Sequence, residues 1–153
     1  MARIDRASRI IRASPHAIYR AYLDADAIAA WRPPEGMTAE IYAFDPRQGG
    51  VYRIAFIYAG EGQGKSSEKA DVFEGCFIEL IADRKIVERV VFKSDDPQFA
   101  GAMTITTTLT PAPGGTAVVV AAQDVPAGIT PEDHQAGMDS SLANLAVFVE
   151  PGA

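Results

Sequence analysis

The chain has 153 residues, of which 48% are hydrophobic and 22% are charged, and its formal net charge is −6. This length and composition predict a single globular domain over residues 1–153 and exclude global disorder. The 20 acidic residues outnumber the 14 Lys and Arg residues, so the protein repels phosphate backbones and we expect no nucleic-acid partner.

The cysteine content and the apolar runs indicate the compartment. The single cysteine, Cys76, cannot form an internal disulfide, and no apolar run approaches the roughly 20 residues that a membrane-spanning helix needs. Charged residues within the first six positions argue against a secretory signal. We therefore expect a cytoplasmic protein without a membrane span, and the sequence leaves both a monomer and a homodimer open.

A first strand and two short helices are expected at the N-terminal end. Ser14 followed by Pro15 is typical of an N-cap and a first helical residue. Asp24 can cap a second helix that carries Trp31, and the prolines that follow Trp31 stop it.

The middle of the chain alternates between apolar and polar residues, which predicts strands. In one segment, Met103, Ile105 and Leu109 share a face while four threonines line the other, so the sheet has one solvated side and is expected to be antiparallel. The predicted strands with this character are Val51–Tyr58, Val72–Ile81, Ile86–Phe92, Met103–Thr110 and Thr116–Gln123.

One long helix closes the chain. Thr130 and Pro131 supply a cap and a first helical residue, followed by two acidic residues at the positive end of the helix dipole. An apolar face then recurs at helical spacing, through His134, Met138, Leu142, Leu145 and Val149. The order predicts an α+β fold of about seven strands, in which the long helix covers the dry face of a curved antiparallel sheet and leaves a cavity beneath it.

Residues 59–66 fit a permissive form of the phosphate-binding loop. The motif needs a helix after it, and the segment that follows leads into another strand instead. We therefore interpret it as a glycine-rich hairpin loop.

Signals for metals, cofactors and nucleophiles are weak. His16 and His134 lie far apart, and no pair of Cys or His residues has the spacing of a zinc site. Cys76 fits a buried, inert thiol better than a nucleophile. We expect no metal, no cofactor and no catalytic set.

Two polar residues have open interpretations. Glu88 lies on the same face of its predicted strand as Ile86, Val90 and Phe92. Its side chain therefore either enters the cavity, as a polar anchor or general base, or is exposed where the strand twists. His134 either reaches the cavity mouth or bonds a neighbouring acid or water at the helix end, and the second alternative is favoured.

Aromatic and methionine residues concentrate on the elements under the last helix, which favours a cavity over a filled core. The predicted ligand-binding residues are Trp31, Tyr52, Phe56, Glu88, Phe92, Met103, His134, Met138 and Leu142.

Several motifs occur in an order that resembles a known family. They are Ser14-Pro15, Trp31-Arg32-Pro33-Pro34, the segment Asp45 to Arg53, Gly75 with Glu79-Leu80, Gly114-Gly115-Thr116, Val125-Pro126, and Gly137-Met138 with Leu142 and Leu145. The chain resembles the AHSA-type family (activator of heat-shock chaperone ATPase homologue) of the START and birch-pollen-allergen-like superfamily, also called SRPBCC.

The resemblance implies a helix-grip fold around a hydrophobic cavity, and it implies no catalytic residues. The leading hypothesis is binding of a small hydrophobic or amphipathic molecule. The alternative is a chaperone ATPase co-activator with a chaperone partner, and an enzyme that uses Glu88 or His134 comes third.

Overall fold

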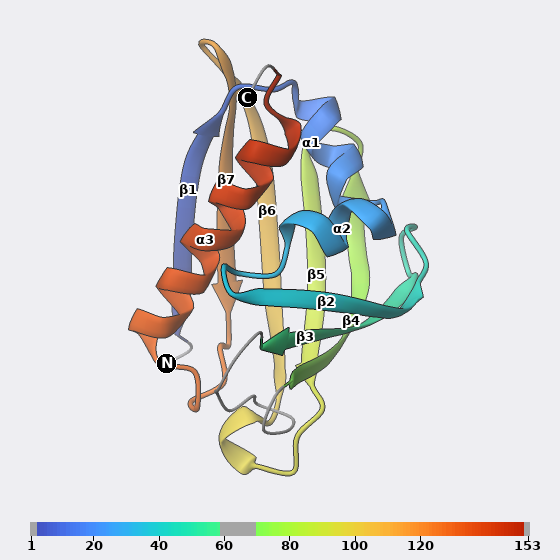
Figure 1. The fold of residues 1–153 in the computed structure, drawn as a ribbon, viewed down its shortest axis with the longest axis vertical. Coiled ribbons are helices and arrows are strands. Elements are labelled where there is room, and N and C mark those ends of the chain that lie inside the picture. The colour runs from blue at the N-terminus through green and yellow to red at the C-terminus, as the bar shows by residue number, and fades with distance from the viewer. Residues whose placement is uncertain (1–2, 59–69, 152–153) are drawn as a thin grey trace.

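We describe residues 3–58 and 70–151 of a computed structural model of the chain (Figure 1). One strand precedes two short helices, six strands follow, and a long helix ends the chain. The elements are β1 (Ile4–Ile11), α1 (Pro15–Tyr22), α2 (Ala25–Trp31), β2 (Met37–Phe44), β3 (Val51–Tyr58), β4 (Ala70–Ile81), β5 (Lys85–Phe92), the 3-10 turn η1 (Pro97–Phe99), β6 (Ala102–Ala112), β7 (Gly115–Gln123) and α3 (Pro131–Val149).

The strands form one antiparallel sheet in the order β1-β7-β6-β5-β4-β3-β2. From β2 to β7 each strand pairs with the next strand in the chain, whereas β1 pairs with the distant β7, so β1 and β2 are the two edge strands. The sheet is curved, and α3 runs along its concave side (Figure 1). The helix packs against β1, α1 and α2, and α2 in turn packs against β2.

Each helix begins where its sequence predicts, because a side-chain oxygen satisfies a free backbone N–H. Ser14 accepts from Ala17 at 3.1 Å, and Asp24 accepts from Ala27 at 3.2 Å. Thr130 does the same for the first turn of α3, with a distance of 3.1 Å to the N–H of Asp133. These caps fix the N-terminal ends of all three helices.

Alternation along the strands divides the sheet into two faces. On β6, Met103 and Leu109 are buried on the concave side, while Thr108 and Thr110 are exposed on the other.

The predicted helix-grip α+β fold is confirmed, as are the strands that the alternation of apolar and polar residues identified. The threonine-rich β6 runs two residues further than predicted, to Ala112, so the hairpin turns at Pro113 and Gly114. The motif at residues 59–66 lies outside the described residues.

Gly75 provides the space for the ring of Tyr52 across the β3–β4 ladder. The two residues are direct partners in the register, and a Cβ built on Gly75 would collide with the Tyr52 ring. Tyr52 is 1% exposed and packs against Phe73 and Phe77. A glycine facing an aromatic ring is a known device for pinning the register of a sheet.

We therefore expect Gly75→Ala to destabilise the protein by about 1–3 kcal/mol, the usual effect of overfilling a packed core. Urea unfolding followed by circular dichroism measures the change. Gly49→Ala is no suitable control because Gly49 has a φ of +83°. Ala121→Ser, on the outer face of β7, is the matched small change and should leave the midpoint in place. An unaltered Gly75→Ala midpoint would contradict the role of this glycine.

Candidate functional site

A buried ion pair lies on the concave side of the sheet. The Arg32 Nη1 and Nη2 atoms donate to the two carboxylate oxygens of Glu88 at 2.7 and 3.1 Å. The hydroxyl of Tyr52 donates to the Glu88 Oε1 atom at 2.7 Å. The Glu88 side chain is 0% exposed and that of Arg32 is 13% exposed. Glu88 therefore faces inward, the first of its two predicted alternatives.

Three elements bring this cluster together. Glu88 lies on β5 between Phe77 of β4 and Ile105 of β6, so its own neighbours on the sheet offer no cation. Arg32 is the C-terminal cap residue of α2, which reaches over the concave face. The guanidinium carbon of Arg32 lies 5.8 Å from the ring centre of Tyr52, close enough for a cation–π contact.

The surroundings stabilise the charged pair and keep the phenols neutral. Burial acts to lower the pKa of Arg32, but the neighbouring Glu88 carboxylate outweighs it and raises that pKa. Burial, and then the Glu88 charge, raise the pKa of Tyr52 well above its ordinary value. Burial also raises the pKa of Tyr22, to about 12. Both Glu88 oxygens already accept hydrogen bonds, and this arrangement stabilises the Glu88 carboxylate in its charged form and fixes the positions of Arg32 and Tyr52.

The concave face is more open toward the other end of the strands. Phe56 and Phe92 share strand faces with fully buried residues and pack against the core, yet they are only half-buried. Ile105 on β6 and Met138 on α3 are also half-buried. The core is thus closed around Tyr52 and Glu88 and incompletely covered beyond them.

The other predicted ligand-binding residues have structural partners. Trp31, Met103 and Leu142 are 2–3% exposed in the core. The Trp31 indole N–H donates to the backbone oxygen of Ala21 at 2.9 Å. The His134 Nδ1 atom lies 2.7 Å from the Asp5 Oδ2 atom on β1, so His134 bonds a neighbouring acid, the alternative that the sequence favoured.

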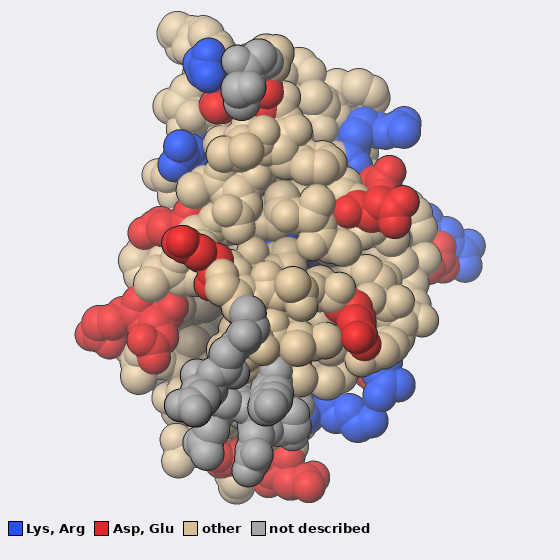
Figure 2. Space-filling view, in the orientation of Figure 1, with Lys and Arg blue, Asp and Glu red and all other residues tan. Residues whose placement is uncertain are grey.

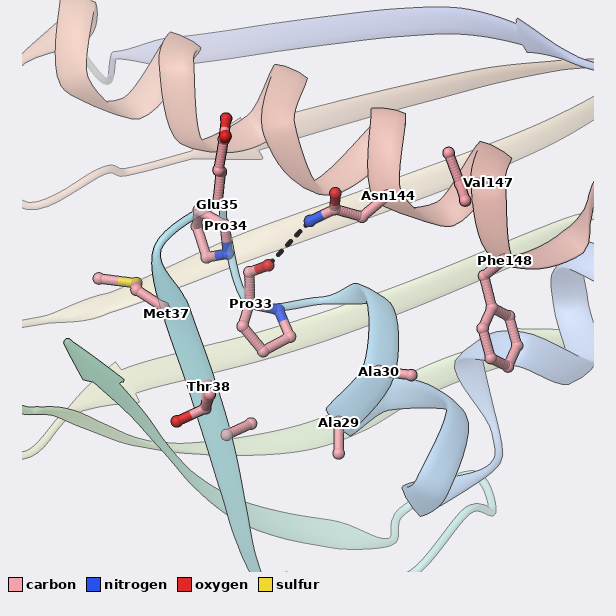
Figure 3. A pocket seen from close by; sticks show the side chains of 11 residues that line it. Ala29, Ala30, Pro33, Pro34, Glu35, Met37, Thr38, Asn144, Val147 and Phe148 are labelled. Carbon is pink, nitrogen blue, oxygen red and sulfur yellow. Dashed lines mark hydrogen bonds between the residues drawn. The ribbon is translucent and has the colours of Figure 1, made fainter. Parts of the chain in front are cut away.

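A separate groove lies outside the sheet, between α2, β2 and α3 (Figure 3). Its volume is about 460 Å³. Apolar side chains from all three elements line it, among them Ala30, Pro33, Met37, Val147 and Phe148. The Asn144 amide donates to the backbone oxygen of Pro33 at 2.9 Å at the base of this groove (Figure 3).

Sequence reasoning did not assign a role to Arg32. The signal that could have indicated a role for Arg32 is the position of Glu88 on the apolar face of its strand, because a buried carboxylate requires a partner. The groove was also missed, since two stretches distant in sequence form it, residues 29–39 and residues 144–148.

No three His, Cys, Asp or Glu side chains in residues 3–58 and 70–151 come together as they would around a metal ion. Within the same ranges, no helix is both long enough and apolar enough to cross a membrane.

The curved sheet and the C-terminal helix that packs on its concave side define a helix-grip protein. Residues 12–150 match the model of the family described as Activator of Hsp90 ATPase homolog 1-like protein. The chain belongs to this family. No curated protein matches it in sequence.

Solved structures with the same fold come from several bacteria. A protein of Chromobacterium violaceum is 34% identical, with a TM-score of 0.87 over 97% of both chains. A Rhizobium loti protein is 24% identical, with a TM-score of 0.72 over 97% of both chains. The AHSA1-like protein from Aeromonas hydrophila is 21% identical, with a TM-score of 0.72 over 96% of this chain and 92% of that one. The last two likenesses show the fold alone.

The ion pair gives a first prediction for the site. Arg32→Met leaves the Glu88 carboxylate buried without its cation, so we expect a loss of about 3–5 kcal/mol in the free energy of unfolding. Arg32→Met combined with Glu88→Leu removes both charges and should lose clearly less than the sum of the single changes. Urea unfolding of the four proteins measures this. Arg47→Met breaks an exposed ion pair and serves as the control that stays unchanged. Additive losses would contradict the coupling.

The Asp5 side chain gives a prediction for pH dependence. Burial acts to raise the pKa of Asp5, but hydrogen bonds from Arg3 and His134 outweigh it and lower that pKa below its ordinary value of 3.8. The folded protein therefore binds fewer protons here than the unfolded chain. The stabilisation is present above about pH 4 and is lost as the pH falls further.

Asp5→Asn should accordingly unfold at a lower temperature than the wild type at pH 5, and the difference should shrink between pH 4 and pH 3. Thermal unfolding at half-unit pH steps measures it. A difference that is constant over this range would show that the carboxylate charge is irrelevant to stability.

Proposed function

We propose that the protein binds a small hydrophobic or amphipathic molecule between the concave face of the sheet and α3. The observation that carries the proposal is the incomplete burial of inward-facing apolar residues, Phe56, Phe92, Ile105 and Met138. Apolar side chains on the covered face of a sheet normally lose nearly all contact with water, so half-buried ones mark space for a guest. The Arg32–Glu88–Tyr52 cluster lies at the closed end of this face.

The charge state of the cluster favours a neutral guest over an anionic one. Glu88 compensates the Arg32 charge through two hydrogen bonds, and Tyr52 directs its proton to the same carboxylate. An added carboxylate would compete with Glu88 for Arg32 while adding to the protein's net charge of −6. A neutral, mainly apolar molecule meets no such repulsion. The nine ligand-binding residues named from the sequence remain part of this proposal.

Filling the space with protein provides the test. Ile105→Trp places a large side chain among the half-buried residues, whereas Thr108→Trp places the same side chain on the exposed face of the same strand. Binding of Nile red, and of a panel of lipids, aromatic compounds and polyketides, is measured by fluorescence and thermal shift. We expect Ile105→Trp to weaken binding by about tenfold or more, equal to about 1.4 kcal/mol, and Thr108→Trp to leave it unchanged.

Uniform absence of binding by the wild type would overturn the proposal. Equal loss in both tryptophan variants would do so as well, because it would point away from the concave face. Circular dichroism confirms that both variants fold before binding is compared.

Co-activation of a chaperone ATPase is the second candidate, and the description of the matching family supports it. Such an activity acts through the protein surface and needs no internal ligand. Stimulation of a chaperone ATPase in a reconstituted assay, equal in the wild type and Ile105→Trp, would favour this function over ligand binding.

A further inference from the structure

The outer groove carries apolar surface that the fold itself does not use. Val147 is 69% exposed and Phe148 is 48% exposed, both on the last two turns of α3. The same turns already supply the core through Leu145 and Ala146, which are 0–1% exposed. The helix is therefore apolar on two sides at this end, and its second apolar side forms a wall of the groove (Figure 3).

The groove is separated from the concave interior by the turn after α2. The Arg32 side chain enters the core, whereas Pro33 and Pro34 line the outer groove. The turn is held in place from α3, because the Ser141 hydroxyl donates to the Arg32 backbone oxygen at 2.6 Å and Asn144 donates to that of Pro33. A molecule in the groove therefore contacts none of the residues proposed to bind the internal ligand.

Acidic side chains surround the groove. Glu35 lines it, and its backbone N–H donates to the hydroxyl of Ser140, beside Asp139. Glu40 lies on the same face of β2 as the groove residue Thr38, and Asp26 lies one helical turn before Ala30. All four acidic residues are exposed. Figure 2 shows this side of the molecule, with uncharged side chains over its middle and both acidic and basic groups farther out.

Basic side chains are missing from the segments that build the groove. Residues 25–40 contain a single Lys or Arg, which is Arg32, and residues 131–149 contain none. Arg32 is turned inward and neutralised by Glu88. These two segments thus give the groove an apolar floor and acidic side chains at its border, with no outward-facing Lys or Arg of their own.

From these features we propose that the groove is a docking site for a basic amphipathic segment of a partner protein. Apolar side chains of the segment pack against Val147, Phe148 and Pro34. Its Lys or Arg side chains lie near Glu35, Glu40 and Asp26. Acidic borders disfavour an anionic lipid surface and an acidic peptide, and they make a second copy of this acidic chain a poor occupant.

Fluorescence anisotropy with defined peptides tests the proposal. The probes are a labelled amphipathic helix of Leu and Lys, a scrambled peptide of identical composition, and the same helix with Glu in place of Lys. We expect the amphipathic basic peptide to bind better than the scrambled one, and the acidic peptide not to bind. Val147→Ser combined with Phe148→Ser should weaken binding about tenfold. Because both side chains are exposed, the variant should fold.

The charge variant is independent of the apolar one. Glu35→Gln combined with Glu40→Gln should weaken binding and flatten its salt dependence. Val51→Ser removes an exposed apolar residue on β3 and should leave peptide binding unchanged.

Equal binding of the scrambled peptide, or full binding by the variant that combines Val147→Ser with Phe148→Ser, would overturn the proposal. So would a dimer in sedimentation that this double variant abolishes, since the occupant would then be a second copy. The part of Nile red binding that Ile105→Trp removes, measured in parallel, reports on the internal site and separates the two proposals.

Discussion

The buried charge of Glu88 is the constraint on which the interior depends. A carboxylate on the concave face of an apolar sheet is tolerated only with a cation and further donors. Its neighbours across the sheet, Phe77 and Ile105, are apolar. The cation must come from outside the sheet, and Arg32 supplies it from the end of α2. The position of α2 over the sheet is therefore tied to a charge on β5, and the hydroxyl of Tyr52 completes the set.

The turn that carries Arg32 transmits this constraint to α3. Ser141 and Asn144 of α3 donate hydrogen bonds to the backbone oxygens of Arg32 and Pro33. The turn that satisfies these polar groups of the long helix is thus the same turn that sends the Arg32 side chain into the core. A helix that only covered an apolar sheet would be free to slide along it. Hydrogen bonds to fixed carbonyl groups select one register of α3 against the sheet.

Much of the fold follows from local signals, whereas the site does not. The caps at Ser14, Asp24 and Thr130 and the alternation along the strands predicted where most elements lie, because these signals act between neighbours in the chain. The edge strand β2 was not located individually, although half-buried and exposed positions alternate along most of it. Glu88 was placed on the inward face only as one of two alternatives. Its partner lies 56 residues away, at a distance that local patterns do not report.

The same pairing also sets the charge of the outer surface. Arg32 is the one basic residue in the segments that form the groove, and the core requires its charge. Had its side chain turned outward, it would lie among the acidic groups around Glu35 and reduce their field. Because Glu88 holds it inside, the border of the groove keeps its negative charge, and Pro33 and Pro34 contribute apolar surface in its place. The interior ion pair thus determines both how the core is closed and which kind of partner the outer face attracts.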